Sequence, residues 1–273
     1  MHRTIILQNN NVIHVLSSKK DILKSRINYI FHARHYNGYG IHSPYIYNLI
    51  THVLDTRYHF YAYEQIEHVW AEMRLLAKDG NKPNLNVSDR KKIASILKAE
   101  KSEKEIGRML FSIIHNMKAE CIIETNFSGS ADSAYMAKAK PHAHCFCFTD
   151  NQGMSDFANE GFRRLGIENI QLFSGNKASE LEKLLESLDN VDLVLFSIPA
   201  KKKDILHDFQ ICLKKKHTNS IFVIKHIHSS HDMESIWQTI TNNPEVCVSM
   251  DLYSMGLLFF RPDLEKRKYV IRK

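Results

Sequence analysis

From residue 119 onward the chain alternates short apolar segments with helical ones, and this alternation constrains the fold more than any other feature. Strands separated by helices of this length need right-handed crossovers, which build a parallel sheet with helices on both faces. The last two apolar segments, 245–251 and 256–261, are joined by only a few residues, which suits an antiparallel hairpin. We predict strands at 119–124, 143–149, 169–173, 191–197 and 220–226, followed by this hairpin.

The part of the chain before residue 119 has a helical pattern interrupted by loops. Apolar residues recur at the spacing of one helix face over residues 63–78. A later helix is predicted to bury Ile106 and Leu110, and Ser102 with Glu105 has the spacing of a capping box at its start. We therefore expect a helical cap before the sheet.

The composition is typical of a soluble globular protein. Of the 273 residues, 44% are hydrophobic and 25% are charged, which can fill a core without disulfides or metals. The expected division is an N-terminal helical extension over residues 1–118 and a sheet domain over residues 119–273. No apolar run approaches the roughly 18 residues of a membrane span, and the first residues lack the pattern of a signal peptide. These features predict a cytoplasmic protein.

Cysteine content and charge bear on possible partners. The five cysteines are odd in number and mostly lie in apolar runs, which indicates reduced, packed thiols. A net charge of +7 favours an anionic partner such as nucleic acid. The basic residues form separate clusters, so they would make a binding surface only if folding brought them together; the clusters are 201–203, 214–216 and 266–273.

The segment IIETNFSGSADS, residues 122–133, is the most informative for function. It places an acid, Glu124, at the end of a buried strand, and a loop of small polar residues leads from there into a helix. In open α/β sheets ligands bind at this end of the strands, and glycines there let the backbone approach a nucleotide-like cofactor. Here the loop holds a single glycine, Gly129.

Several longer phrases give the chain a family resemblance. These are HARHYNGYGIHSPYIYNLI, FYAYEQIE, EGFRRLGIENIQLFSGN, VIKHIHSSHDMESIW and DLYSMGLLFFR. They resemble class I S-adenosylmethionine-dependent methyltransferases, and in particular the O-methyltransferase-like proteins of Bacteroidetes-type bacteria. The resemblance extends over nearly everything from about Ile27 to Arg272. It implies an α/β, Rossmann-like class I methyltransferase fold, with a seven-stranded, mostly parallel sheet, a closing antiparallel hairpin and an N-terminal helical cap.

The resemblance also implies a set of cofactor-binding positions. The family loop resembles E-L-G-T-S-L-G-I-S-T, so Asn126 and Ser130 stand where relatives have glycines, and Gly129 lies one place early. A ribose-binding acid after the second strand would be Asp150. The implied S-adenosylmethionine site therefore consists of Glu124, Asn126, Ser128, Gly129, Ser130, Asp150 and Asn176. A tight strand-to-helix turn without a ligand is the alternative interpretation of the loop.

Acids that the resemblance implies at two other strand ends are replaced. Relatives read F-I-D-G-N-H and D-D-I-H, and those aspartates could hold a divalent cation. This chain has Ser197 at the first position, and Lys225 with His226 at the second. A hard cation needs oxygen ligands, so we predict no magnesium or calcium site.

The end of the fifth predicted strand still carries groups capable of proton transfer. Methyl transfer to a hydroxyl or amine needs alignment and a base, and His226 or His228 could be that base; His228 matches a family histidine. Lys225 completes the predicted catalytic set. If it is enclosed it needs a carboxylate partner or a lowered pKa, and Glu124 is the partner that we propose from sequence.

Three functions are compatible with these observations. The leading one is a metal-independent, S-adenosylmethionine-dependent methyltransferase that acts on a small-molecule acceptor, most simply at oxygen. The alternative is a binding or regulatory protein on the same fold that has lost catalysis, because function lives in the site and not in the fold. A nucleic-acid methyltransferase or binder is a further alternative. It rests on the positive charge and lacks an Asn/Asp-Pro-Pro-aromatic motif.

Overall fold

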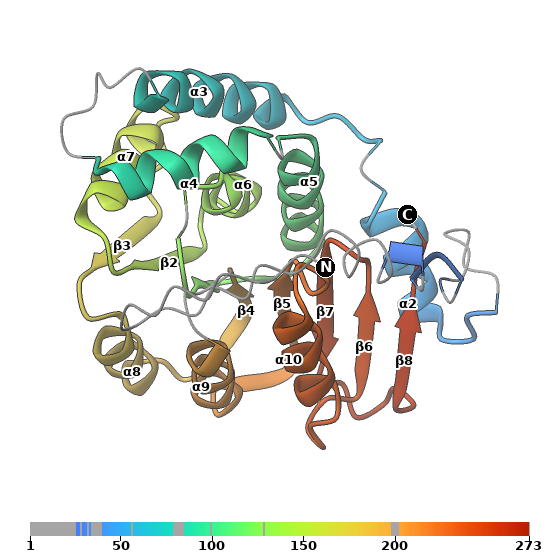
Figure 1. The fold of residues 1–273 in the computed structure, drawn as a ribbon. Helices are drawn as coiled ribbons and strands as arrows, with labels where there is room; N and C mark the ends of the chain where they lie inside the picture. The colour runs from blue at the N-terminus through green and yellow to red at the C-terminus, as the bar shows by residue number, and fades with distance from the viewer. Residues whose placement is uncertain are drawn as a thin grey trace, which may run out of the picture.

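A computed structural model describes residues 26–27, 29–31, 33, 40–55, 57–78, 85–98, 100–127, 129–197 and 202–272. Its centre is one mixed sheet of order β3-β2-β1-β4-β5-β7-β6-β8 (Figure 1). The pairs among β1 to β5 are parallel, and β7 is antiparallel to both β5 and β6. The strands are β1 (Cys121–Glu124), β2 (His144–Thr149), β3 (Ile170–Ser174), β4 (Val191–Phe196), β5 (Lys216–Lys225), β6 (Val248–Asp251), β7 (Met255–Phe259) and β8 (Arg267–Val270).

The prediction of five parallel strands and a closing hairpin is confirmed, but the predicted number of strands was wrong. The described sheet has eight strands, because β8 adds in parallel to the outer side of β6. Its residues, RKYV, begin inside a basic cluster. Strand prediction relies on apolar alternation, and only Tyr269 of this segment is buried, so the segment lacks the pattern by which a strand is recognised.

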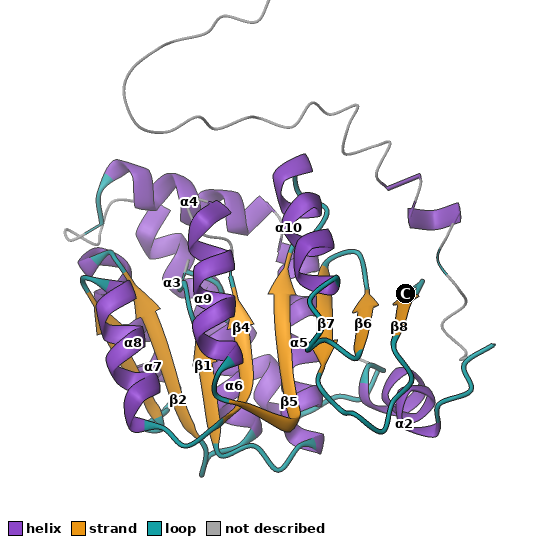
Figure 2. Ribbon diagram, turned by 90° about the horizontal axis from the view of Figure 1, so that it is seen from below, coloured by secondary structure: helices purple, strands orange, loops and turns teal. Residues whose placement is uncertain are grey.

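Helices cover both faces of the sheet (Figure 2). One face packs against α8 (Lys177–Ser187), α9 (Lys202–Leu213) and α10 (His231–Thr241), and the other against α5 (Glu100–Asn116), α6 (Asp132–Ala139) and α7 (Gln152–Arg164). Outside this second layer lies α3 (Tyr61–Lys78), next to α4 (Val87–Lys98). The helix α2 (Pro44–Asn48) continues as a π-helical turn, η1 (Leu49–Val53).

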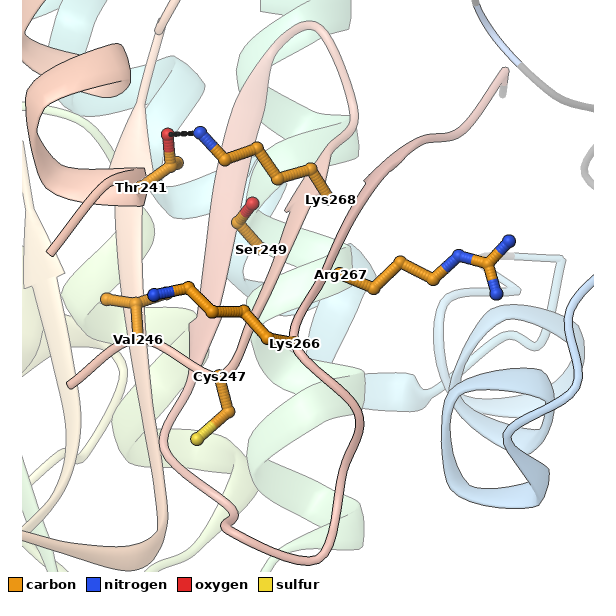
Figure 3. Close-up of a pocket in the computed structure, with 7 residues that line it drawn as sticks. All are labelled: Thr241, Val246, Cys247, Ser249, Lys266, Arg267 and Lys268. Atoms are coloured by element: carbon orange, nitrogen blue, oxygen red, sulfur yellow. Dashed lines mark hydrogen bonds between the residues drawn. The ribbon is translucent and has the colours of Figure 1, made fainter. Parts of the chain in front are cut away.

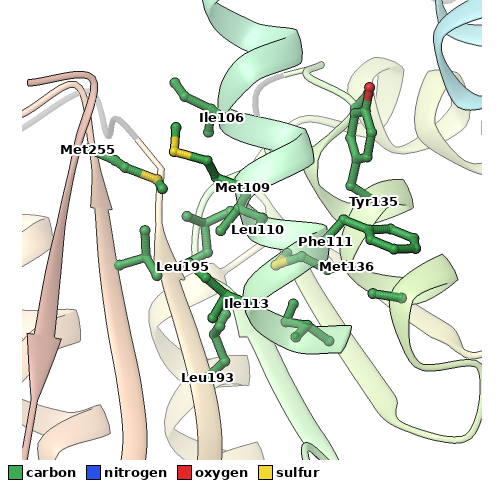
Figure 4. Packing of buried hydrophobic residues seen from close by; sticks show 14 of the residues in the cluster. Ile106, Met109, Leu110, Phe111, Ile113, Tyr135, Met136, Leu193, Leu195 and Met255 are labelled. Carbon is green, nitrogen blue, oxygen red and sulfur yellow. The ribbon is translucent and has the colours of Figure 1, made fainter. Parts of the chain in front are cut away.

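The helix α5 forms part of the main core although it lies within the predicted cap. Its face bearing Ile106, Leu110 and Ile113 is buried, as predicted, and it packs beside Leu195 of β4 and Met255 of β7 (Figure 4). The predicted capping box was wrong. The helix already begins at Glu100, so both members of the box lie inside its first turns. The division of the chain at residue 118 remains a prediction.

Four of the five cysteines are buried and all five are free thiols, as expected for packed cysteines. No helix in the described part of the chain combines the length and the apolar character needed to cross a membrane.

Candidate functional site

The acid at the end of β1 is enclosed by protein at the carboxyl ends of the parallel strands. Glu124 is completely buried. The Ser133 hydroxyl donates to its Oε2, and the Ser197 hydroxyl donates to its Oε1 over 2.9 Å. Ser197, which stands where the resemblance implies a metal-binding acid, thus serves as a donor to the acid of the neighbouring strand. Both carboxylate oxygens of Glu124 are bound within the protein.

A buried ion cluster lies beside Glu124. The Lys225 ammonium at the end of β5 donates to Glu103 Oε2 over 2.8 Å and to Asp132 Oδ2 over 2.5 Å. All three side chains are at least nine-tenths buried. Ser130 also donates to Asp132 Oδ2, over 2.6 Å. The lysine therefore ties the end of β5 to the first turns of α5 and α6.

This geometry corrects the predicted partner of Lys225. Its hydrogen-bonded carboxylates are Glu103 and Asp132, and Glu124 acts on it only through its charge. Burial lowers the pKa of Lys225, but the two adjacent carboxylates outweigh burial and raise the pKa well above its ordinary value. Lys225 is a permanent cation here and cannot serve as a base.

The two acids nearest this cation are shifted in opposite directions. Burial raises the pKa of Glu103, but the charge of Lys225 and hydrogen bonds from His226 and Lys225 outweigh burial and hold it at about 2. Burial, followed by the negative charge of Asp132, raises the pKa of Glu124 to about 7. Asp132 Oδ1 is buried and accepts no hydrogen bond from the described residues. The cluster therefore places an acid with a raised pKa, Glu124, next to the ion pair of Lys225.

His226 is held by the same cluster. Its Nε2 lies 3.0 Å from Glu103 Oε1, and its backbone N–H donates to Ser254 O over 2.6 Å. Its φ of 53° lies in the left-handed region, which non-glycine residues adopt rarely and which is often found at functional sites. The contact with Glu103 satisfies the ring nitrogen nearest the cluster.

His228 lies between two carboxylates at the other side of the β5 terminus. Its Nδ1 is 3.0 Å from Glu234 Oε1, and its Nε2 is 2.8 Å from Asp251 Oδ2. Its ring stacks on Tyr253, with 5.2 Å between centroids. Burial lowers the pKa of His228, but the bonds and charges of Asp251 and Glu234 outweigh it and raise the pKa. A ring whose two nitrogens both contact carboxylates has no nitrogen left to accept a proton from a substrate.

The protonation of His228 can be checked directly. In an NMR titration, its imidazole midpoint is expected above the ordinary value of about 6.5. Asp251→Asn is expected to lower that midpoint, because it removes the charged partner while the amide oxygen can still accept from the Tyr253 N–H. Stability supplied by His228 is complete below its unfolded pKa and is lost as the pH rises through the folded one. An unchanged midpoint in Asp251→Asn would contradict this assignment.

The loop that follows β1 is bound into the core. The Trp70 indole N–H of α3 donates to Gly129 O over 3.0 Å, and the Phe127 N–H donates to Phe148 O over 2.7 Å. Gly129 has a φ of 94°, which favours glycine. Asn126 is half-buried and donates to its neighbour Thr125. Ser128 lies outside the described residues.

The ends of β2 and β3 remain accessible. Asp150 is exposed, and its Oδ1 accepts the Lys177 N–H over 3.1 Å. Gly175, directly after β3, has a φ of 120°, and no atom lies within 4 Å of the place where a Cβ would be. Asn176 is exposed and caps α8 by accepting from the Ser179 N–H. This part of the strand edge has open space beside an acid.

Sequence reasoning missed Glu103, Asp132 and Trp70. Asp132 was detectable in principle, because it lies in segment 122–133, close to the predicted cofactor positions, where the family pattern has a serine. Glu103 and Trp70 lie in helices far along the chain, and only the folded structure shows which strand ends they reach. Among the described residues, no three His, Cys, Asp or Glu side chains are grouped in a way that could hold a metal ion.

Comparison with known proteins shows the fold class. No protein-family model and no curated protein sequence matches the chain. An O-methyltransferase from Bacillus cereus, solved with S-adenosylhomocysteine, aligns with a TM-score of 0.51 and 12% identity over 70% of this chain and 90% of its own. The O-methyltransferase TomG from Streptomyces achromogenes, solved with S-adenosylmethionine, aligns with a TM-score of 0.50 and 14% identity over 75% and 91%.

A third similar structure is the Podospora anserina methyltransferase PaMTH1, solved with S-adenosylhomocysteine. It aligns with a TM-score of 0.51 and 13% identity, over 80% of this chain and 97% of its own. The chain therefore has the Rossmann-like α/β fold of class I methyltransferases. At identities this low the similarity establishes the fold, and the chemistry must be argued from the site.

Proposed function

We propose that this chain is a binding or regulatory protein that has the methyltransferase fold but does not catalyse methyl transfer. A buried ion cluster occupies the strand ends that methyl transfer would use. The observation that carries the proposal is the pairing of Lys225 with Glu103 and Asp132, all three buried. The resemblance implies acids at the end of β5, where this chain has a cation. The carboxylate that neutralises it in the first turn of α6, Asp132, takes the place of a family serine.

The other predicted catalytic groups support the same proposal. His226 is bound to Glu103, and His228 is held between Glu234 and Asp251. A general base must have a nitrogen free to accept the substrate proton. His228 has both ring nitrogens bound to carboxylates and so lacks one for this role, whereas His226 is bound to Glu103 through Nε2 alone.

Half of an S-adenosylmethionine site fits the residues that are present. Asp150 and the open space at Gly175 are suited to the ribose and adenine end. The methionine end would lie against Glu124, whose two oxygens are already bound, and against the loop carbonyl held by Trp70. These residues leave the sulfonium end of the ligand without a binding surface of its own.

The second candidate is a metal-independent methyltransferase acting on an oxygen of a small-molecule acceptor. The accessible Asp150 and Gly175 favour it, since they keep the nucleoside end of the cofactor site. When bound, S-adenosylmethionine would supply the methyl group. Alignment by the surrounding residues would then have to provide the rate, because transfer is an in-line displacement.

Calorimetric titration separates the two candidates. If the methionine end has no binding surface, S-adenosylmethionine is expected to bind no more tightly than adenosine. Asn126→Gly with Ser130→Gly is expected to leave that ratio unchanged, because the Lys225 cluster remains. Binding of S-adenosylmethionine at least about tenfold tighter than adenosine, which is about 1.4 kcal/mol, together with release of S-adenosylhomocysteine, would establish the enzyme instead.

A further inference from the structure

A small pocket lies where β6 and β8 begin, at the opposite end of the strands from the candidate site. Its cavity volume is about 160 Å³, and it is lined by Thr241, Val246, Cys247, Ser249, Lys266, Arg267 and Lys268 (Figure 3). The strand register places it. Val248 of β6 pairs with Arg267 at this end, whereas Asp251, which binds His228, pairs with Val270 at the other.

Two lysines supply the charge of this pocket. Lys266 and Lys268 extend to the same side of β8, Lys268 toward Thr241 and Lys266 toward Val246, while Arg267 extends to the other side (Figure 3). The Lys268 ammonium donates to Thr241 Oγ1 over 3.0 Å and to Asn242 Oδ1 over 2.6 Å. Both acceptors are neutral, so the positive charge of Lys268 is not compensated by them.

The neighbouring basic residues are compensated. Lys216 lies 3.0 Å from Glu245, and Arg261 lies 3.0 Å from Asp263. Within the described part of the chain, neither Lys266 nor Lys268 forms an ion pair with a carboxylate. Burial and, after it, the positive charge of Lys266 lower the pKa of Lys268, as expected for neighbouring ammonium groups. An anion between them would remove this repulsion.

A hydrogen-bond donor also faces the pocket. Ser249 of β6 lines the cavity, and the residue as a whole is 3% exposed. Its hydroxyl forms no hydrogen bond with the residues that the structure describes. The hydroxyl lines the pocket, so it can donate a hydrogen bond to a ligand there. No Asp or Glu lines the pocket, so nothing there opposes a negative ligand.

We propose that this pocket binds a phosphate group, held by the Lys266 and Lys268 ammonium groups and by the Ser249 hydroxyl. Ammonium and hydroxyl donors are the groups that bind phosphate oxygens in proteins. The phosphate belongs either to a small phosphate ester or to the backbone of a nucleic acid, whose contacts with this end of the strands the basic residues would extend.

The test measures binding of inorganic phosphate and glycerol 3-phosphate at low salt by calorimetry. Lys266→Gln with Lys268→Gln is expected to weaken phosphate binding at least about tenfold, since it removes both charged donors to the phosphate. Ser249→Ala is expected to weaken it by a smaller factor. The matched control, Lys138→Gln with Lys140→Gln, removes the same charge from the end of α6 and is expected to bind like the native protein.

Two results would overturn the proposal. One is absence of phosphate binding by the native protein at low salt, and the other is equal weakening in both double variants. Titration with a short single-stranded RNA then distinguishes the sources of the phosphate. Greater loss of RNA affinity in the Lys266 and Lys268 variant than in the control assigns the site to a nucleic-acid backbone. Equal loss in the two assigns it to a small phosphate ester.

Discussion

Replacing Lys225 with methionine is expected to lower the free energy of unfolding by about 3 to 5 kcal/mol, the effect of breaking a buried ion pair. Methionine fills a similar volume but leaves Glu103 and Asp132 buried without their cation. Each must then be protonated or stay charged in a poorly solvated place. Chemical denaturation at neutral pH, followed by circular dichroism, measures the change.

A matched control distinguishes the effect of breaking a buried ion pair from the effect of replacing a lysine in an exposed pair. Lys216 of the same strand forms a pair with Glu245, whose side chain is 55% exposed. Lys216→Met is expected to change stability by about 1 kcal/mol or less, as exposed pairs do. The triple variant Lys225→Met, Glu103→Gln, Asp132→Asn removes all three charges and is expected to recover much of the lost stability. Equal effects of Lys225→Met and Lys216→Met would show that the cluster is not a buried ion pair.

The second large effect is a change in the free energy of unfolding with pH, caused by the titration of Glu124. Burial and the charge of Asp132 raise its pKa to about 7 in the folded protein, above its ordinary value of about 4.3. The folded state therefore binds this proton more tightly than the unfolded state, and stability falls as the pH rises from about 4.3 to about 7. The full difference is roughly 4 kcal/mol, and it is present above pH 7.

Glu124→Gln removes this titration and keeps the side chain's size. Its amide oxygen can accept one of the two serine hydroxyls that now bind the carboxylate. Relative to the native protein, the variant is expected to gain roughly 3 kcal/mol between pH 5 and pH 8. Groups that titrate in both proteins cancel in this difference. A gap between the two unfolding free energies that does not change with pH would refute the raised pKa.

The sheet was predictable because its evidence is local. The segments around Ile122, Phe146 and Val194 are apolar over a few consecutive residues, and helices of regular spacing separate them. β8 was missed for the same reason, since its sequence is charged and its burial depends on a neighbour, β6. A short edge strand carries too few apolar positions for its pattern to be recognised.

The site was only partly predictable because its partners are distant in sequence. Lys225 was identified as an unusual buried cation, and its need for a carboxylate follows from physical chemistry. The sequence could not select the carboxylate, since Glu103 is 122 positions away and Asp132 is 93 positions away. His228 is different, because its carboxylate partners in α10 and β6 are only 6 and 23 positions away, yet the turn after β5 that brings them to the ring is not encoded in a periodic pattern.

The position of α5 in the main core has a consequence for how the chain is made. Its apolar face, with Ile106, Leu110 and Ile113, is covered by β4 and by Met255 of β7 (Figure 4). A ribosome releases α5 well before it releases those strands, so the growing chain presents this face to water until β4 and β7 have been made. Exposed apolar surface on incomplete chains promotes aggregation. Until those strands are made, this face of α5 is therefore a place where incomplete chains can associate.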